Sequence, residues 1–436
     1  MDFNLIGTCW SLLPPVVAIA LALKTKEVYS SLFIGIILGA ALFSYSMGTG
    51  FEGFLSHLLN DTVGTGDTAK QYGLIHCLAD PWNVGILVFL VVLGAIVSLM
   101  NKAGGSAAFG QWASKHVKTK RGAQIATILL GILIFIDDYF NCLTVGSVMR
   151  PITQRHGVTK EKLAYLIDST AAPVCVISPI SSWAAAVSGF VTGDENGLAL
   201  FCKAIPYNFY SLLTFVFIIA LTLMKFDYGP MRMHEMSAQL NGHLGGLENS
   251  EDENANPKGK VIDLILPVVT LIIACTVGMI YVGGFFGVDA WGGTDCAGDF
   301  IGAFGNTDAF VGLPWGGIIA LVLTVIYLCA RRVITFKEAM ACVPKGFIAM
   351  VPPIIILTLA VSLKTMINSL GADVYVHDLM FAASKRLYSM LPAVIFVVAC
   401  ILAFSTGTSW GTFGILIPIV TAVFPADSNL LIIGIS

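Results

Sequence analysis

Two adjacent carboxylates, Asp137 and Asp138, lie in the apolar stretch GILIFIDDYFNCL. Inside a membrane, one ionised carboxylate costs roughly 2.5–3.5 kcal/mol even on a lenient insertion scale. Two neighbouring carboxylates can hardly both stay ionised without a cation or a proton, because like charges at this separation repel each other. The pair therefore predicts a site at which Na⁺ and H⁺ compete. The alternative is that one aspartate only caps the helix that follows.

A second polar stretch, DSTAAP at 168–173, lies inside an apolar segment that covers 163–192. Pro173 lacks an amide donor and clashes with the preceding turn, so we expect the helix to break there. A break exposes carbonyl groups, which suit Na⁺, and amide groups, which suit an anion. The oxygen-bearing side chains available to a hard cation are Asp168, Ser169, Thr170, Ser178, Ser181 and Ser182. The alternative is a proline kink with hydroxyls bonded back to the helix.

A third polar stretch, STGTS at 405–409, carries no charge but is rich in hydroxyl groups. Gly407 permits unusual backbone angles there. The hydroxyls of Thr406, Thr408 and Ser409 could bind a carboxylate or complete the ligand shell of a cation. The alternative is close packing of helices through small residues.

The composition predicts an all-α polytopic membrane protein. Hydrophobic residues make up 56% of the 436 positions and charged residues 12%, whereas soluble domains carry about 25% charged residues. Several apolar runs reach the roughly 20 residues that cross a hydrocarbon core. The predicted spans are 8–24, 28–47, 83–101, 163–192, 205–225, 261–283, 309–330 and 347–363.

Charge distribution predicts the orientation of these spans. Short loops rich in Lys and Arg should face the cytoplasm, as at 115–121, 150–162 and 331–332. The acidic loops 48–82, 193–204 and 284–308 then lie outside, as does the N-terminus. The first segment lacks a basic n-region and a cleavage site, so we interpret it as a retained span.

Residues 123–150 are too few for two full crossings, which need about 40 residues. Basic flanks at both ends require the chain to enter and leave on one side. Two helical arms of ~14 residues would each reach roughly 21 Å. We therefore predict a re-entrant hairpin whose turn lies at 135–141, where non-helical backbone must be buried in protein or line a wet cavity. Two short tilted spans are the alternative.

The second half resembles the first with inverted topology. A shift of 267 residues lays 93–105 over 360–372 and Pro151 over Pro418. The predicted organisation is a first repeat at 1–225, with its broken helix at 163–192, a polar cytoplasmic connector at 226–260, and a second repeat at 261–436 with a hairpin at 391–419. Such inverted repeats place the site of many carriers near the membrane midplane. Because the partner of 169–173 is missing from the second half, we expect the natural chain to continue beyond Ser436.

Other classes of function are disfavoured. The ten cysteines show no metal-ligand spacing, although a bridge between Cys77 and Cys296 is conceivable. No phosphate-binding G-x-x-x-x-G-K-[ST] motif is present, which argues against ATP-driven pumping. An intramembrane aspartic protease needs carboxylates on two facing helices, which adjacent residues cannot supply. We expect no enzyme activity, no organic cofactor and no nucleic-acid partner.

The stretches FIDDYFNCLTVGSVMRPIT, KLAYLIDSTAAPVCVISPISSWAA and FSTGTSWGTFGILIPI resemble the NhaC-type Na⁺/H⁺ antiporter family. The resemblance implies a multi-pass carrier of the bacterial inner membrane, coupled to Na⁺ and H⁺ and often dimeric. The family also includes carriers that resemble malate/lactate exchangers and amino-acid transporters. The binding candidates that the resemblance implies are Asp137, Asp138, Asn141, Thr144, Asp168, Ser169, Thr170, Thr406, Thr408 and Ser409.

Two hypotheses follow. The first is Na⁺/H⁺ antiport by alternating access, with Asp137, Asp138, Asn141 and Asp168 binding the cation or proton and with Asp138 and Asp168 as Na⁺ ligands. The second is Na⁺- or H⁺-coupled transport of a small organic acid or amino acid. In that case the hydroxyl groups and the open amides hold the substrate carboxylate: Thr144, Ser169, Thr170, Ser178, Ser181, Thr406, Thr408 and Ser409.

Overall fold

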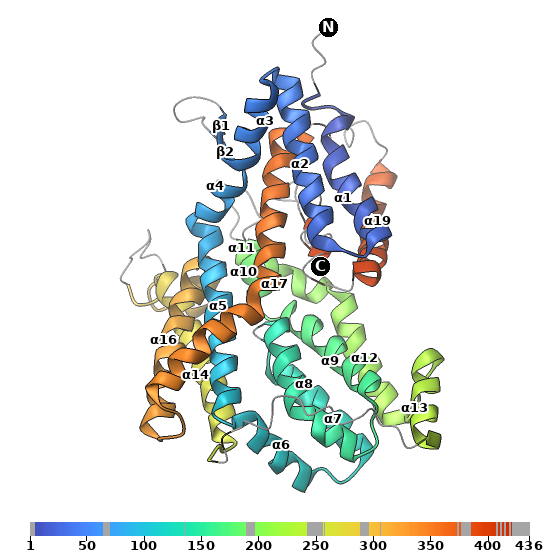
Figure 1. Cartoon of the computed structure of the whole chain (residues 1–436), viewed down its shortest axis with the longest axis vertical. Helices are drawn as coiled ribbons and strands as arrows, with labels where there is room; N and C mark the ends of the chain where they lie inside the picture. The colour runs from blue at the N-terminus through green and yellow to red at the C-terminus, as the bar shows by residue number, and fades with distance from the viewer. Residues whose placement is uncertain are drawn as a thin grey trace. The chain divides into compact units, whose positions relative to one another are not determined.

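The computed structural model describes most of the chain, and within that part it is almost wholly helical (Figure 1). The described residues are 5–63, 70–135, 137–188, 197–241, 256, 258–287, 296–305, 307–372, 375, 385–406, 409, 412, 413, 416, 417 and 420. Six described helices are long and apolar enough to cross a membrane: Val28–Met47, Asn83–Lys102, Phe209–Ala238, Ile262–Val282, Phe310–Ala330 and Phe336–Ser369. The prediction of an all-α polytopic membrane protein is confirmed.

The chain divides into two compact units. Unit 1 comprises Met1–Val84, Val187–Tyr207 and Val351–Ser436, and unit 2 comprises Gly85–Ala186 and Asn208–Met350. The elements that lie in unit 1 are η1 (Cys9–Leu12), α1 (Leu13–Thr25), α2 (Val28–Met47), α3 (Gly50–Leu59), β1 (Asp61–Val63), β2 (Lys70–Tyr72), α4 (Leu74–Ala79), α11 (Gly197–Ala204), η3 (Ile205–Tyr207) and α19 (Lys385–Thr406).

Unit 2 contains the segment 123–150, for which the sequence predicts a hairpin, and most of the segment 163–192, for which it predicts a broken helix. Its elements are α6 (Gly105–His116), α7 (Lys120–Leu133), α8 (Asp138–Arg155), α9 (Lys160–Cys175), α12 (Phe209–Met224), α13 (Gly229–Asn241), α14 (Ile262–Val282), α15 (Phe300–Gly305) and α16 (Ala309–Ala330). The division between the units falls within three further helices: α5 (Pro81–Lys102), α10 (Ser182–Ser188) and α17 (Phe336–Ser369).

In unit 1, helix α2 has well-defined ends and packs closely on α17. The Glu27 carboxylate accepts hydrogen bonds from the first free amides of α2, those of Tyr29 at 3.1 Å and Ser30 at 2.7 Å. The helix ends at Gly48, whose φ of 66° is the left-handed conformation that glycine adopts without strain. In between, a Cβ at Gly39 would lie 2.8 Å from Cβ of Met366, so only glycine allows this approach.

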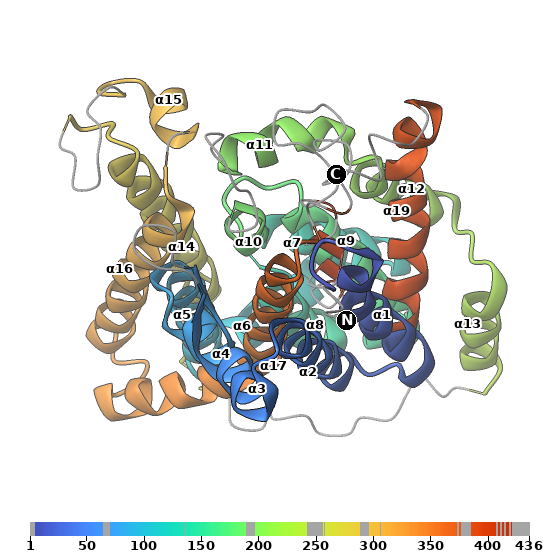
Figure 2. The same cartoon turned by 90° about the horizontal axis from the view of Figure 1, so that it is seen from above.

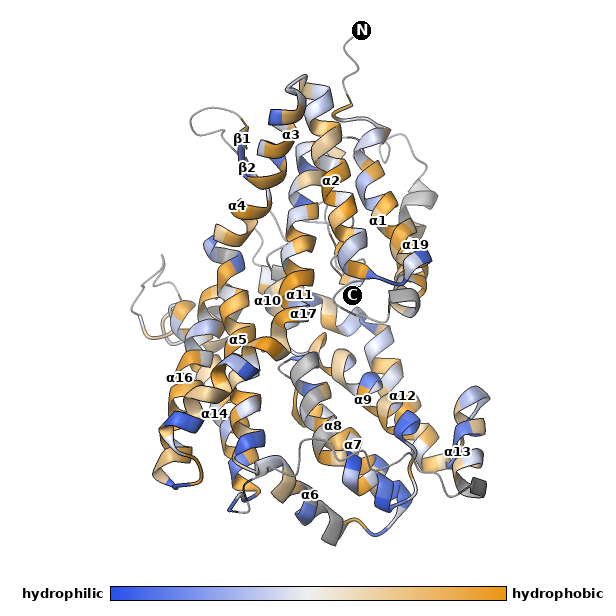
Figure 3. Ribbon diagram, viewed as in Figure 1, coloured by the Kyte–Doolittle hydropathy of each residue, from blue (hydrophilic) through white to orange (hydrophobic). Residues whose placement is uncertain are grey.

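In unit 2, α14 and α16 form a tight pair, side by side in Figures 1 and 2. A Cβ at Gly316 would lie 2.3 Å from Cα of Cys275, so the two backbones touch through small residues, as in membrane helix pairs. Figure 3 shows hydrophobic residues along both helices. Large apolar side chains of α16 stay exposed, as a lipid-facing surface requires: Ile318, Ile319, Val322, Leu323 and Ile326.

Helix α7, the first arm of the hairpin, is held by an apolar cluster. Ile128 of α7, Leu166 of α9 and Ile218 of α12 pack together and are buried.

The connector between the predicted repeats contains a helix, α13, that packs on the start of α9. Glu235 of α13 is 4% exposed, accepts hydrogen bonds from the amide and hydroxyl of Thr159 at 3.1 and 2.9 Å, and pairs with Lys120.

The predicted spans agree with the observed helices in most places. The spans 28–47 and 309–330 match α2 and α16, and 347–363 lies inside the longer α17. The connector 226–260 contains α13, which the polar composition did not predict. Cys77 and Cys296 are both free thiols, so the conceivable bridge is not formed.

The break in the segment 163–192 is present but lies later than predicted. Helix α9 continues through Pro173 to Cys175, and α10 begins at Ser182. A proline removes one amide donor, but later amides can still bond, and Val176 N donates to the carbonyl of Ala172 at 3.0 Å. The expectation that the helix breaks at Pro173 is therefore wrong by a few residues.

The segment 123–150, predicted as a re-entrant hairpin, contains α7 and α8, and the described residues between them, Ile134, Phe135 and Asp137, are not helical. In the second half, α19 ends at Thr406, and residues 407 and 408 of the predicted polar turn 405–409 lie outside the described residues. Helices α5 and α17 end at Lys102 and Ser369, which are 369 − 102 = 267 residues apart. The inverted repeat and the sides of the membrane stay predictions.

A substitution of Gly346 tests the contact between α5 and α17. A Cβ at Gly346 would lie 2.2 Å from the carbonyl carbon of Gly94, so Gly346→Ala should destabilise the fold by about 1–3 kcal/mol. We expect a lower melting temperature in detergent. The matched control is Gly146→Ala, where the new Cβ would meet Ile167 Cδ1 at an ordinary 3.8 Å. Equal melting temperatures for the two variants would contradict the close crossing.

Candidate functional site

Asp137 and Asp138 lie at the turn between α7 and α8. Asp137 is 0% and Asp138 5% exposed. The carbonyl of Asp137 accepts the amide of Asn141 at 2.9 Å, so α8 begins at the pair itself. Both carboxyl groups therefore sit at the positive end of the α8 dipole, which favours negative charge there.

Asn141 ties the end of α7 to the start of α8. Its side-chain Nδ2 donates to the carbonyls of Gly131 and Ile134, both at 2.7 Å. These carbonyls lie in the last turn of α7 and in the turn after it. At the end of a helix, such carbonyl groups have no amide partner within the helix. Asn141 is fully buried, and its Oδ1 has no hydrogen-bond partner among the described residues. That oxygen is therefore available to a cation.

The second interruption of the backbone lies at 176–181, between α9 and α10. Ser181 caps α10, because its Oγ accepts the amide of Ala184 at 3.1 Å and donates to the carbonyl of Ser178 at 2.8 Å. The next residue, Ser182, donates its hydroxyl to Oδ2 of Asp137 at 2.7 Å, and both side chains are fully buried. This hydrogen bond joins the two helix breaks that the sequence predicts separately.

Helix α9 passes close to α7 at Thr170. A Cβ at Gly131 would lie 2.5 Å from Thr170 Oγ1, so glycine is needed on α7 for this approach. The Thr170 hydroxyl itself donates back to the carbonyls of Leu166 and Ile167 at 2.9 and 3.0 Å. Thr170 therefore fits the alternative interpretation of this stretch, in which a hydroxyl group bonds back to its own helix.

The remaining candidates, on α8, on α9 and in the break after α9, differ in burial. Thr144 is fully buried, while Ser169 and Ser178 are 8% and 9% exposed. Asp168 is exposed, so the structure does not bring its side chain into the buried group around Asp137. It does lie near Cys142, on which Asp137, Asp138 and Asp168 all act electrostatically. Among the described residues, no three His, Cys, Asp or Glu side chains converge as a metal site would require.

The candidates of the second half lie in unit 1. Thr406 is the last residue of α19, Ser409 is half-buried, and Thr408 lies outside the described residues. Their part in a site stays a prediction.

Sequence reasoning missed two features. Ser182 was one of several hydroxyls, and its contact with Asp137, 45 residues away, has no local signal. The buried Lys162, which pairs with Asp227 at 2.5 Å, lies in a basic stretch that predicts only a solvated surface. In both cases the partner comes from a distant segment of the chain.

Chemically, the described site combines two buried carboxyl groups, an unpartnered amide oxygen and carbonyls at an interrupted helix. Such oxygen ligands are those that hard cations prefer. Apolar spans with a carboxylate pair at a helix break are typical of multi-pass membrane carriers, in which buried ionisable groups mark ion pathways.

Comparisons with known proteins agree with this class. The model of the Na⁺/H⁺ antiporter family matches residues 174–426. An uncharacterised protein of Haemophilus influenzae is 32% identical over 432 residues, which cover 97% of this chain and 78% of that protein. The chain belongs to the Na⁺/H⁺ antiporter family.

A more distant relative has an assigned activity. The Na⁺/H⁺ antiporter NhaC of Bacillus subtilis is 23% identical over 210 residues, which cover 47% of this chain and 44% of that protein. No solved structure matches the chain. The family match begins at residue 174, so it includes Ser182 but not Asp137 or Asp138.

The hydrogen bond between Ser182 and Asp137 can be tested through stability. Ser182→Ala leaves a buried carboxyl group without this donor, which should cost about 1.5–3 kcal/mol if Asp137 is ionised. The matched control is Thr222→Val, because Thr222 is buried and its Oγ1 has no partner among the described residues. We expect a clear loss of thermal stability for the first variant and almost none for the second. Equal losses of thermal stability in the two variants would mean that the hydrogen bond from Ser182 to Asp137 does not stabilise the fold.

Proposed function

We propose that the chain exchanges Na⁺ for H⁺ across the bacterial inner membrane by alternating access, with its N-terminus outside. The shared site is the carboxyl pair of Asp137 and Asp138. One observation carries the proposal: Asp137 is fully buried, adjacent to a second buried carboxyl group, and hydrogen-bonded to Ser182 across two helix breaks.

Competition between the two ions follows from the burial of the pair. Two adjacent negative charges without a counterion are too costly at low dielectric, so the pair holds a proton or a cation. Na⁺ would find a carboxylate of Asp137 or Asp138 and the free Oδ1 of Asn141. A proton on one carboxyl group reduces the charge that attracts Na⁺, so each ion displaces the other.

The hydrogen bond to Ser182 defines which parts move together. It joins the hairpin of α7 and α8 to the broken helix of α9 and α10. Gly131 and Thr170 add a second, close contact between the same segments. In the proposed cycle these segments carry the site as one body while access changes from one side to the other.

The proposal is tested with the purified chain in proteoliposomes that contain a pH-sensitive dye. With no organic solute present, an imposed Na⁺ gradient should drive proton movement in the opposite direction. If proton or Na⁺ flux appears only after a small organic acid or amino acid is added, antiport is wrong and coupled solute transport replaces it. Absence of any flux under both conditions contradicts transport of either kind by this chain.

Replacement of Asp138 should abolish the exchange. Asp138→Asn removes one of the two charges that attract the cation and leaves a side chain of nearly the same shape, so we expect folded protein without Na⁺-driven proton flux. The control is Glu161→Gln in the first turn of α9, which removes a charge outside the buried group and should keep the wild-type rate. Wild-type flux in Asp138→Asn would exclude Asp138 from the site.

A further inference from the structure

The surface between α8 and α9 carries an exposed thiol and an exposed carboxyl group. The two helices pack side by side in unit 2 (Figure 1). Cys142 of α8 and Asp168 of α9 are both exposed. They lie near each other, because the Asp168 carboxylate acts electrostatically on the Cys142 thiol, as do Asp138 and Asp137. An exposed charge thus lies next to the buried carboxyl pair.

One face of α8 leads from this surface to the pair. Asp138, Asn141 and Cys142 are spaced i, i+3 and i+4, so they share one face of the helix. Cys142 is exposed, Asp138 is 5% exposed and Asn141 is fully buried. The Oδ1 atom of Asn141 has no hydrogen-bond partner among the described residues. The same face therefore joins the exposed surface to the oxygen atoms that could hold a cation.

A face of α9 shows the same change in exposure. Asp168, Ala172 and Cys175 are spaced i, i+4 and i+7, so they also share one face. Asp168 is exposed, Ala172 is half-buried and Cys175 is fully buried. Asp138 and Asp137 act electrostatically on the Cys175 thiol, so the buried end of this face lies near the pair. Both helices therefore lead from an exposed to a buried region at the same place.

The contact between α8 and α9 leaves room on the α8 side. A Cβ at Gly146, one turn beyond Cys142, would meet Ile167 Cδ1 of α9 at 3.8 Å, an ordinary contact. By contrast, a Cβ at Gly131 would lie 2.5 Å from Thr170 Oγ1, where α7 and α9 press together. Helices α8 and α9 are therefore less tightly packed near Cys142 than α7 and α9 are at Gly131.

The exposed surface has the chemistry of a wet surface. Asp168 lies 168 − 160 = 8 residues after the start of α9, which is roughly 12 Å along the helix. An ionised carboxylate is costly in lipid, so such a residue faces water or the protein interior. The lipid-facing surface of α16 differs, because it exposes Ile318, Ile319 and Val322. The exposure of Asp168 therefore indicates water between α8 and α9.

We propose that hydrated cations reach the Asp137/Asp138 pair from this surface, between Cys142 and Asp168, and that the Asp168 carboxylate attracts them there. The inference rests on the proposed function and adds the entry route to it. An exposed carboxylate raises the local concentration of cations through its electrostatic potential. Asp138, the member of the pair that keeps some exposure, then meets the ion first. Asp168 is an entry residue and not a ligand of the buried site.

The test measures the reaction of Cys142 with two charged thiol reagents in the full chain, held in lipid nanodiscs in sodium-free buffer. The reagents are a cationic and an anionic methanethiosulfonate, and non-reducing peptide mass spectrometry follows each cysteine separately. Both reagents attack the same thiolate, so the ratio of their rates reports the electrostatic potential at the thiol and not its own reactivity. We expect the cationic reagent to react several-fold faster with Cys142. The fully buried Cys175 should react with neither reagent.

Cys400 of α19 is the matched control for the presence of water. Its thiol is also exposed, but Phe396 and Val397, which precede it by one turn, are exposed as well. Lipid against such an apolar face excludes both charged reagents, so Cys142 should react much faster than Cys400. Equal rates at the two thiols, or no reaction at Cys142, would overturn the proposal.

The role of Asp168 is tested by removing its charge. At about 0.1 M ionic strength, exposed charges act over about 10 Å, so Asp168→Asn should lower the ratio of cationic to anionic rates at Cys142 several-fold. Glu161→Gln, two turns earlier on α9, should change the ratio little. An unchanged ratio in Asp168→Asn, or an equal fall in both variants, contradicts the role of Asp168. These measurements need no transport, so their failure and the failure of antiport are separate results.

Discussion

Within a membrane, the polar groups of the backbone must find their partners inside the protein, and the rest of this structure depends on that constraint. The hydrogen bond from Ser182 to Asp137 and the two from Asn141 to α7 are its clearest consequences. They allow two interrupted helices to coexist with buried carboxyl groups. Without them, the carbonyls of Gly131 and Ile134 would lose their side-chain donor, and the Asp137 carboxyl group would lose the Ser182 hydroxyl.

Close backbone contacts position these interrupted segments. Gly131 lets α9 approach α7 at Thr170, and Gly94 meets Gly346 where α5 and α17 cross. Lipid cannot drive apolar helices together as water does, so packing through small residues takes over that role. The apolar cluster with Ile218 adds side-chain packing behind the hairpin. Helices α7 and α9, which carry part of the candidate site, thus approach each other closely through a glycine.

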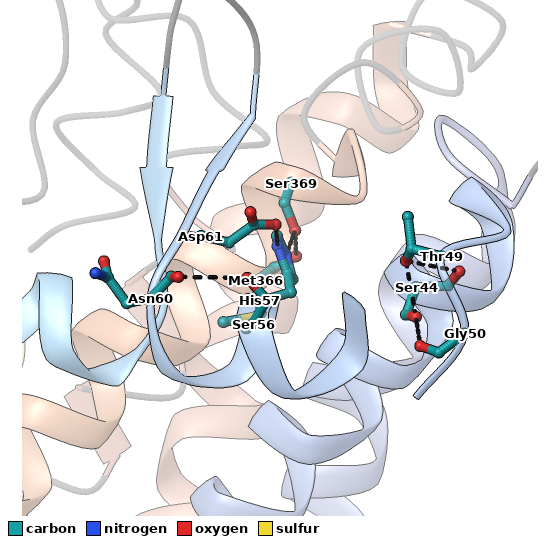
Figure 4. A network of polar contacts seen from close by, with 9 residues as sticks. All are labelled: Ser44, Thr49, Gly50, Ser56, His57, Asn60, Asp61, Met366 and Ser369. Carbon is teal, nitrogen blue, oxygen red and sulfur yellow. Dashed lines mark hydrogen bonds and ion pairs between the residues drawn. The ribbon is translucent and has the colours of Figure 1, made fainter. Parts of the chain in front are cut away.

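Buried charged residues outside the candidate site also have partners within the protein. Glu235 and Lys162 are buried, and each is paired with a residue that is distant in sequence. His57 is also buried, and its ring nitrogens lie 3.0 Å from Asp61 Oδ2 and 3.0 Å from Ser369 Oγ (Figure 4).

Sequence alone determined the class and most helix limits, because these depend on local hydropathy and on segment length. It also predicts Asp137 and Asp138 as candidate site residues, since adjacent carboxylates in an apolar run are costly wherever the chain folds. Tertiary structure alone decided that Ser182 bonds to Asp137, that Thr170 bonds back to its own helix and that Asp168 is exposed. Those outcomes depend on which distant segments meet, and no local pattern encodes that choice.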